Sequence, residues 1–235
     1  TSYDEKDKRT GQLIAQHKIS KPIEVLHEGV ELEKWQAPKK VDKFLEDIKT
    51  DFNYLVVGHW LQGDIGQDRK DIGMTIKTFC TVFKDVPKKD QPGLILKTST
   101  AGFSVMDREN ISKKIKDITK EFGDKCPSIY LLFGDLSENE LANLYHHPKV
   151  KSMLSFTKGE GYGRPLCEFT LTGKPIIVSK WSGHTDFLPE NNTKYIDGTL
   201  TEVHPTAAND FLLKEAKWFS VNYSVAAGKI FEVWK

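Results

Sequence analysis

The residues best suited to chemistry are Glu160 and Glu168, two glutamates separated by seven residues that include a glycine-rich turn. They lie in the segment SFTKGEGYGRPLCE, which covers residues 155–168. The glycines of this turn permit backbone conformations that a side chain would forbid, and they let a ligand approach the main chain closely. Carboxylates accept hydrogen bonds from neutral hydroxyl groups, such as those of a sugar, but they are poorly suited to bind phosphate. The pair therefore favours a role in holding hydroxyl groups.

The turn between the glutamates is also a candidate anion site. If a helix starts within residues 163–166, Pro165 suits its first turn, where the missing N–H costs nothing. The free amides of residues 161–164 and the positive end of the helix dipole would then face the mouth of the loop. We expect Glu160 at the rim of this anion site and Glu168 further along, on the helix.

A second group of polar residues follows an apolar run at residues 51–58 (DFNYLVVG). Such a run is typical of a buried parallel strand. His59 opens the polar loop that comes next, and Arg69 and Lys70 close it. A helix over 72–83 should then begin, because its apolar stripe consists of Ile72, Ile76, Phe79, Cys80 and Phe83.

Strands and helices must alternate to position these loops. The pattern predicts strands at 51–58, 91–98, 128–133, 152–156, 175–179 and 193–196, and helices at 72–83, 107–122, 137–146 and 163–173. Ser137 and Glu140 have the spacing of a capping box. Such alternation indicates an α/β fold with a parallel sheet and helices on both faces, and ligands bind such folds at the carboxyl ends of the strands. The loops 59–70, 134–136, 158–164 and 181–186 should all lie at that edge.

Composition excludes several classes of protein. Among 235 residues, 38% are hydrophobic and 29% charged, and the net charge is +1, so nothing favours nucleic acid or an anionic membrane as a partner. We find no apolar run long enough for a transmembrane segment and no signal peptide. The three cysteines are widely spaced without a C-x-x-C pattern, which indicates reduced thiols in a cytoplasmic protein. No spacing suggests a metal site.

The ordered motifs resemble the C-terminal, donor-binding domain of GT-B glycosyltransferases, in particular the retaining enzymes of glycosyltransferase family 4. Those enzymes carry two glutamates at this spacing within an E-G-(F/Y)-G-x-P sequence, followed by G-x-P-(I/V) and G-G-x-x-E turns. The counterparts here are Glu160, Glu168, GKPI at 173–176 and SGHTD at 182–186, where Ser182 replaces a glycine and Asp186 a glutamate.

The basic loop carries the resemblance further. Members of that family have G-R after the first strand and R-K-G or R-K-N before the helix, and these basic residues hold the donor diphosphate. Lys70 matches the lysine, whereas His59 stands where the arginine normally lies. A neutral histidine offers one hydrogen bond and no charge, so Arg69 or Arg164 would have to supply part of the diphosphate clamp.

The resemblance covers roughly residues 23–235. It implies a Rossmann-like parallel sheet that forms the C-terminal half of a GT-B fold, with the C-terminal helix included. Residues 1–22 would be an N-terminal arm or a remnant of the acceptor domain. The residues themselves predict a helix around 8–17 and then a short strand at 22–27. The stretch 206–234 is predicted to be helical. It would either brace the first GT-B domain or pack on its own sheet.

The resemblance also implies the chemistry. A sugar would pass from a nucleotide-diphosphate sugar, commonly of uridine or guanosine, to an unknown sugar, lipid or protein acceptor with retention of configuration. Glu160 would orient the sugar and Glu168 would hold the ribose, while Lys70 would neutralise the leaving diphosphate. The remaining donor-binding candidates are His59, Arg69, Gly161, Tyr162, Gly163 and Arg164. No cofactor and no metal are expected.

Other functions stay open. The chain could be a stand-alone nucleotide-sugar-binding module without turnover, since a full transferase needs a missing N-terminal GT-B domain or a partner that supplies it. A glycoside hydrolase would need two carboxyl groups roughly 5 to 10 Å apart, and it would leave Lys70 without a role. A dehydrogenase-type nucleotide module is disfavoured because the first strand lacks G-x-G-x-x-G.

Overall fold

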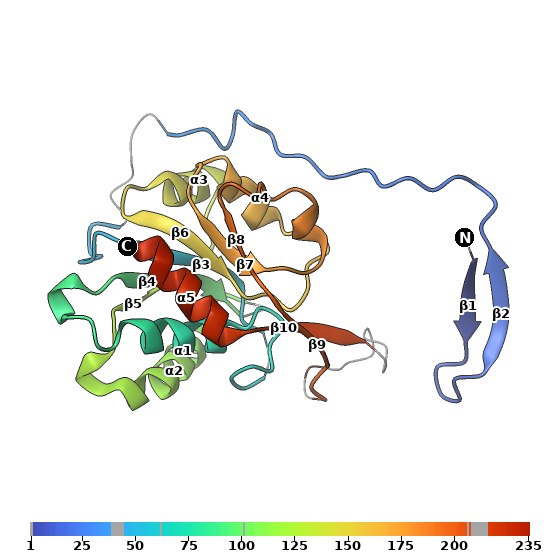
Figure 1. The fold of residues 1–235 in the computed structure, drawn as a ribbon, viewed down its shortest axis with the longest axis horizontal. Coiled ribbons are helices and arrows are strands. Elements are labelled where there is room, and N and C mark those ends of the chain that lie inside the picture. Colours follow the sequence, from blue (N-terminus) through green and yellow to red (C-terminus); the bar gives the residue numbers. More distant parts are fainter. Residues whose placement is uncertain (1, 39–44, 62, 101, 206, 208–215) are drawn as a thin grey trace.

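The structure, a computed structural model, describes residues 2–38, 45–61, 63–100, 102–205, 207 and 216–235 (Figure 1). Its centre is a six-stranded sheet in which each neighbouring pair is parallel, in the order β5-β4-β3-β6-β7-β8. The strands are β3 (Asn53–His59), β4 (Gly93–Ser99), β5 (Ile129–Leu132), β6 (Val150–Ser155), β7 (Ile176–Ser179) and β8 (Thr193–Ile196). All six predicted strands between residues 51 and 196 are confirmed.

The order of the strands places the two candidate loops together. From β3 the chain moves to one side of the sheet through β4 and β5, and from β6 it moves to the other side through β7 and β8. The loops after β3 and β6 therefore leave neighbouring strands in opposite directions at the carboxyl edge. This is the topological switch point, where doubly wound sheets bind ligands.

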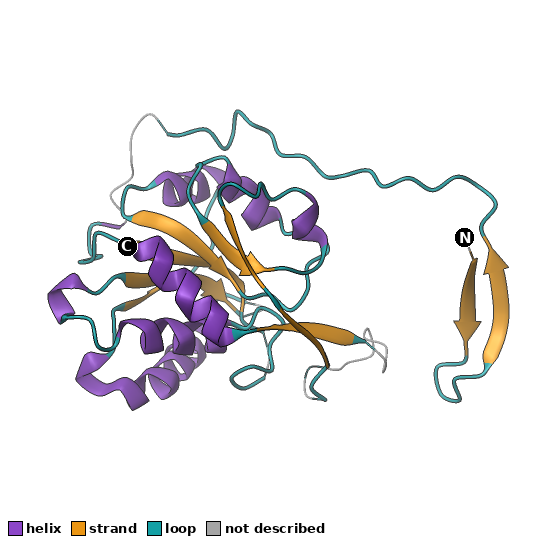
Figure 2. Cartoon of the chain, in the orientation of Figure 1, coloured by secondary structure: helices purple, strands orange, loops and turns teal. Residues whose placement is uncertain are grey.

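Helices cover both faces of the sheet (Figure 2). One face packs against α1 (Ile72–Phe83), α2 (Val105–Thr119) and α5 (Tyr223–Trp234), and the other packs against α3 (Glu138–His146) and α4 (Arg164–Thr170). Alternate residues of one strand enter opposite cores, as Tyr54 and Leu55 do on β3. The two-residue period of a strand with both faces covered explains why the sequence reads as a continuous apolar run.

Helix starts follow the sequence closely. Ser137 caps α3 through a reciprocal capping box with Glu140, as predicted, and Ser104 does the same for α2 with Asp107. Short 3₁₀ turns complete the domain at η2 (Lys88–Asp90), η3 (Lys120–Lys125) and η4 (Gly183–Asp186). Every helix in the described part of the chain is too short or too polar to cross a bilayer.

Two predictions at the N-terminus were wrong. Residues 8–17 do not form a helix, because β1 (Ser2–Lys6) and β2 (Leu13–Lys18) form an antiparallel hairpin. Its turn is fixed by the Asp7 carboxylate, which accepts hydrogen bonds from the amides of Arg9 and Thr10 at 2.9 and 2.7 Å. Residues 22–27 are extended and largely exposed rather than a strand of the sheet, and the hairpin stands apart from the sheet in Figure 1.

The predicted C-terminal helix begins later than the sequence suggested. Residues 206 and 208–215 lie outside the described part. Residues Lys217–Val221 form β10, which pairs antiparallel with β9 (Gly198–Glu202), and α5 starts only at Tyr223. Phe219 and Val221 are buried on one side of β10, so the stretch has the period of a strand. Helix α5 packs on its own sheet, where Ile230 is fully buried and its carbonyl accepts a hydrogen bond from Tyr54 at 2.6 Å.

Candidate functional site

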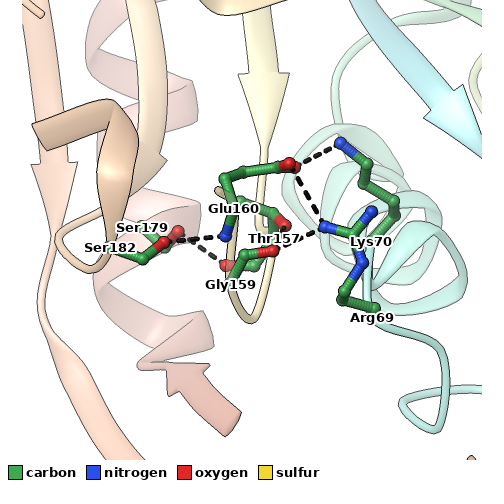
Figure 3. A network of polar contacts seen from close by, with 7 residues as sticks. All are labelled: Arg69, Lys70, Thr157, Gly159, Glu160, Ser179 and Ser182. Carbon is green, nitrogen blue, oxygen red and sulfur yellow. Dashed lines mark hydrogen bonds and ion pairs between the residues drawn. The ribbon is translucent and has the colours of Figure 1, made fainter. Parts of the chain in front are cut away.

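The switch point brings three of the predicted site residues into contact. Glu160 lies in the β6–α4 loop, and its Oε1 forms an ion pair with Lys70 Nζ from the β3–α1 loop (Figure 3). Glu160 Oε2 lies 3.2 Å from Nη1 of Arg69. The side chains of Glu160 and Lys70 are only 10% and 16% exposed, whereas that of Arg69 is 47% exposed. The result is a largely buried carboxylate held between two cations at the carboxyl edge of the sheet.

The charge of Glu160 is set by two opposing effects. Burial raises the pKa of this carboxyl, but the charges of Lys70 and Arg69 and hydrogen bonds from Lys70 and Thr157 outweigh burial, so the pKa lies below its usual value. Glu160 is therefore ionised at neutral pH. Chemically, the pair offers an acceptor for hydroxyl groups directly beside a donor for an anion.

Lys70 reaches this position because Gly58, at the end of β3, leaves room for its side chain. A Cβ added to Gly58 would lie 3.2 Å from the Lys70 Cε and 3.3 Å from its Cδ. The stem of the lysine thus packs on the backbone of the strand and presents only its ammonium group to the site.

The loop that carries Glu160 is fixed by its neighbour, the β7–η4 turn. Glu160 N donates a hydrogen bond to Ser182 Oγ at 2.8 Å, and Gly183 N donates to the Glu160 carbonyl at 3.2 Å. Ser179 Oγ donates to the Thr157 carbonyl at 2.7 Å. A Cβ on Gly183 would lie 1.9 Å from the carbonyl oxygen of Gly161, so this close approach requires glycine.

Ser182 replaces a glycine of the resembled motif and retains a glycine-like backbone. Its φ of 75° and ψ of −167° fall in a region that only glycine occupies easily, at a cost of about 1–3 kcal/mol for other residues. The hydroxyl accepts the hydrogen bond from the Glu160 amide. Sequence reasoning named the substitution but missed this contact, since it depends on the distance between two loops.

Glu168 lies on α4 as predicted, but in a different environment from Glu160. Helix α4 begins after Gly163, whose φ is 94°, and has Pro165 in its first turn. Glu168 is 4% exposed, its Oε2 accepts a hydrogen bond from Tyr145 OH at 3.2 Å, and its Oε1 lies 3.1 Å from Arg164 Nε. Burial raises the pKa of this carboxyl to about 7, against the opposing effects of Arg164 and Tyr145. Arg164 thus forms its ion pair with Glu168, whereas the partners of Glu160 are Lys70 and Arg69.

The other predicted residues lie around the cluster without joining it. His59 is exposed at the end of β3, and its Nδ1 lies 2.9 Å from Ser99 Oγ. Tyr162 turns toward the N-terminal segment, where its hydroxyl donates to the Glu28 carbonyl at 2.6 Å. Gly161 is exposed, and a Cβ there would meet open space. In the described residues, no group of three or more His, Cys, Asp or Glu side chains is placed to hold a metal ion.

Comparison with known proteins supports the fold. No family model matches the sequence, and no curated protein matches it in sequence. Among solved structures, the C-terminal domain of LpcC, a glycosyl transferase group 1 family protein from Francisella tularensis, is 16% identical with a TM-score of 0.54, over 72% of this chain and 80% of that chain. A glycosyltransferase from Rickettsia africae is 15% identical with a TM-score of 0.55, over 88% of this chain and 45% of that chain.

A third structure contains ligands. HepE from Anabaena, solved in complex with UDP and glucose, is 15% identical with a TM-score of 0.50, over 72% of this chain and 41% of that chain. The present chain thus spans less than half the length of the two longer proteins and most of the length of the isolated LpcC domain. With its parallel six-stranded sheet wound outward from a central switch point, the described part of the chain has the fold of the C-terminal domain of GT-B glycosyltransferases.

Proposed function

We propose that this chain is the donor-binding domain of a retaining glycosyltransferase that uses a nucleotide-diphosphate sugar. The observation that carries the proposal is the contact between Lys70 and Glu160 at the switch point. One half of the pair suits an anion and the other suits sugar hydroxyls, so together they match the two chemical parts of such a donor. The UDP and glucose in the structure of HepE are a ligand set of this kind.

In this proposal each residue has a distinct role. Lys70, with Arg69, neutralises the charge that develops on the leaving diphosphate. Glu160 accepts hydrogen bonds from the sugar hydroxyls and orients the ring. Removal of a preorganised group of this type typically costs about 3 kcal/mol of transition-state stabilisation.

The remaining donor contacts lie around that pair. Glu168 holds the ribose hydroxyls, with Arg164 and Tyr145 fixing its carboxylate. The amides of Gly161, Tyr162 and Gly163 face the diphosphate, and His59 offers it one hydrogen bond in place of an arginine. For retention, the acceptor attacks the face from which the diphosphate departs. A diphosphate oxygen takes the acceptor's proton as the bond between the anomeric carbon and oxygen breaks, so the step requires no metal.

Transfer also needs a site for the acceptor, which we assign to an N-terminal GT-B domain or to a partner that supplies one. We place the protein in the cytoplasm. The second candidate is a stand-alone nucleotide-sugar-binding module without turnover.

The test is a binding panel with uridine, guanosine and adenosine diphosphates and their sugar conjugates, with and without Mg²⁺. We expect metal-independent thermal stabilisation by one base, of about 2.7 kcal/mol at a hundred times the Kd. If the protein also releases the free nucleotide diphosphate when an acceptor is present, it is a transferase. If it binds without this release, it is a binding module. If no nucleotide stabilises the protein, both candidates are excluded for this chain.

A further inference from the structure

A buried ion pair lies directly beside the cluster of Lys70 and Glu160. Nζ of Lys158 lies 3.4 Å from Oδ1 of Asp71, and the two side chains are 6% and 0% exposed. Lys158 comes two residues before Glu160, and Asp71 comes directly after Lys70. The pair therefore connects the same two loops that carry Lys70 and Glu160, one layer deeper in the protein.

The main chain reinforces this connection. Lys158 N donates a hydrogen bond to the Arg69 carbonyl at 2.8 Å, so the two loops are joined through backbone as well as through side chains. The Lys158 carbonyl in turn accepts a hydrogen bond from Phe219 N on β10 at 3.0 Å. The β6–α4 loop is thus bonded through Lys158 both to the β3–α1 loop and to β10.

The C-terminal helix supplies a third member. Tyr223, the first residue of α5, donates a hydrogen bond from its hydroxyl to Asp71 Oδ2 at 2.6 Å. We refer to Lys158, Asp71 and Tyr223 as the buried triad. It joins three segments that are far apart in the sequence, namely the β3–α1 loop, the β6–α4 loop and the start of α5.

Asp71 stands at the start of a helix, but its side chain does not cap that helix. It occupies the N-cap position of α1, where an aspartate normally accepts a hydrogen bond from the first turn, yet its side chain makes no such bond. The Asp68 carboxylate makes it instead, accepting from Ile72 N at 3.1 Å. Asp71 also adopts a left-handed backbone with a φ of 54°, which directs its carboxylate inward to Lys158 and Tyr223. The backbone at Asp71 therefore directs the carboxylate to the other two members of the triad and not to the amides of the first helical turn.

Stability alone does not explain such an arrangement. Burial raises the pKa of Asp71 even though Lys158 and Tyr223 oppose the shift, so the charged carboxylate is not fully compensated. Buried ion pairs of this kind often contribute less to stability than apolar residues of similar volume, and their best-attested role is to specify one arrangement.

We propose that the buried triad is a set of positioning residues that fixes the separation of Lys70 and Glu160. The donor site then depends on the C-terminal segment β10–α5, although no residue of that segment is among the donor-binding candidates. The part of this inference that concerns the donor rests on the proposed function. The part that concerns Lys70 and Glu160 rests on geometry alone.

The test uses the ligand-free protein first. Glu160 is titrated by carboxyl ¹³C NMR in the wild type, in Tyr223→Phe, and in a double variant with Asp71→Asn and Lys158→Met that leaves no buried charge unpaired. We expect the pKa of Glu160 to rise in both variants, because Lys70 no longer stays in place to hold it down. The single variant Lys158→Arg retains a cation beside Asp71. In this variant the pKa of Glu160 should therefore stay close to its wild-type value.

Matched controls come from the same fold. Tyr195→Phe removes a half-buried hydroxyl that donates to the Leu188 carbonyl at 3.3 Å, and Lys149→Met removes an amino group that donates to the Leu45 carbonyl at 3.3 Å, away from the carboxyl edge. Both should leave the Glu160 titration unchanged. Circular dichroism and thermal unfolding establish that each variant is folded.

Affinity for the nucleotide diphosphates is the second readout. The triad variants should bind the nucleotide identified for the wild type at least about tenfold more weakly, because small displacements of binding groups have effects of that size or larger. An unchanged Glu160 titration in folded Tyr223→Phe and in the folded double variant would overturn the inference. If the wild type binds no nucleotide, the proposed function fails, and the titration still decides whether the triad positions Glu160.

Discussion

Lys70 and Glu160 form an ion pair across the junction of two loops, although 90 positions separate them in the sequence. Each residue is predominantly buried, and each compensates the charge of the other. Any anion that binds Lys70 therefore also meets Glu160, so ligands that carry hydroxyl groups close to a phosphate fit the pair better than phosphate alone.

Lys70→Met should separate the two parts of a donor. We expect binding of a nucleoside diphosphate to weaken by about 3 kcal/mol, roughly a hundredfold, because a preorganised cation is lost. Binding of the corresponding nucleoside should change little. Calorimetric titration of both ligands measures the difference, with Lys77→Met on the outer face of α1 as the control. Equal losses for the two ligands would mean that Lys70 acts only on the structure.

Glu168 should make stability depend on pH. Its pKa is raised from 4.5 to about 7 in the folded protein, so the native state holds an extra proton between these values. Stability should therefore fall as pH rises from about 4.5 to 7, by on the order of 3 kcal/mol, and stay constant above that range as far as this group is concerned.

Urea unfolding at several pH values checks this expectation. Glu168→Gln should remove the decrease in the free energy of unfolding between about pH 4.5 and 7. Glu33→Gln, at an exposed position, should leave this decrease unchanged. Tyr145→Phe removes a hydrogen bond to the ionised carboxylate and should extend the decline to higher pH. A wild-type slope that persists in Glu168→Gln would assign the effect to another group.

At position 182, a glycine variant should be more stable than an alanine variant, the reverse of the usual order of stability. Ser182→Gly and Ser182→Ala both remove the acceptor for the Glu160 amide, which contributes about 1 kcal/mol. Only glycine relieves the strain of the backbone at a φ of 75°. Ser182→Gly should therefore be more stable than Ser182→Ala by about 1 kcal/mol in chemical denaturation. The opposite order would mean that the strained turn is absent in solution.

Gly183→Ala should disturb the site more than its small size suggests. The added methyl group would overlap the carbonyl of Gly161, so the Glu160 loop or η4 must shift. Overpacking of this kind typically costs about 1–3 kcal/mol. Gly159→Ala is the control in the same loop, since a Cβ at that position meets nothing within 4 Å. Thermal unfolding and nucleotide binding of the two variants should differ clearly, and a mild effect of Gly183→Ala on both would contradict the close approach.

Much of the sheet could be predicted because its strands are apolar on both faces and are bounded by glycine and by helix caps. The meeting of the two loops followed from the rule that parallel strands share one carboxyl edge. The ion pair itself could not be predicted, since it depends on β3 and β6 being neighbours. The single sign of the triad was Asp71, which stands where the resembled motif has glycine or asparagine, the residues that best tolerate a left-handed backbone.

The two ends of the chain were harder to predict, for different reasons. The N-terminal hairpin has charged and exposed strands without apolar alternation, so only Asp7 and Gly11 marked its turn. At the C-terminus, the whole stretch 206–234 was predicted to be helical. The alternation that distinguishes β10 from α5 is only five residues long, which is too short to outweigh its surroundings.

The packing of α5 also has a consequence for the order of folding. Tyr54 on β3 is bonded to Ile230, 176 positions later, and the β3–β6 pairing likewise joins distant segments. Contacts of such long range form slowly, because loop closure must precede them. During synthesis on the ribosome, β3 and its neighbours emerge long before the final helix, so Asp71 obtains the Tyr223 hydroxyl only when translation of the described residues is nearly complete. The geometry of the site is thus among the last features to form within the described residues.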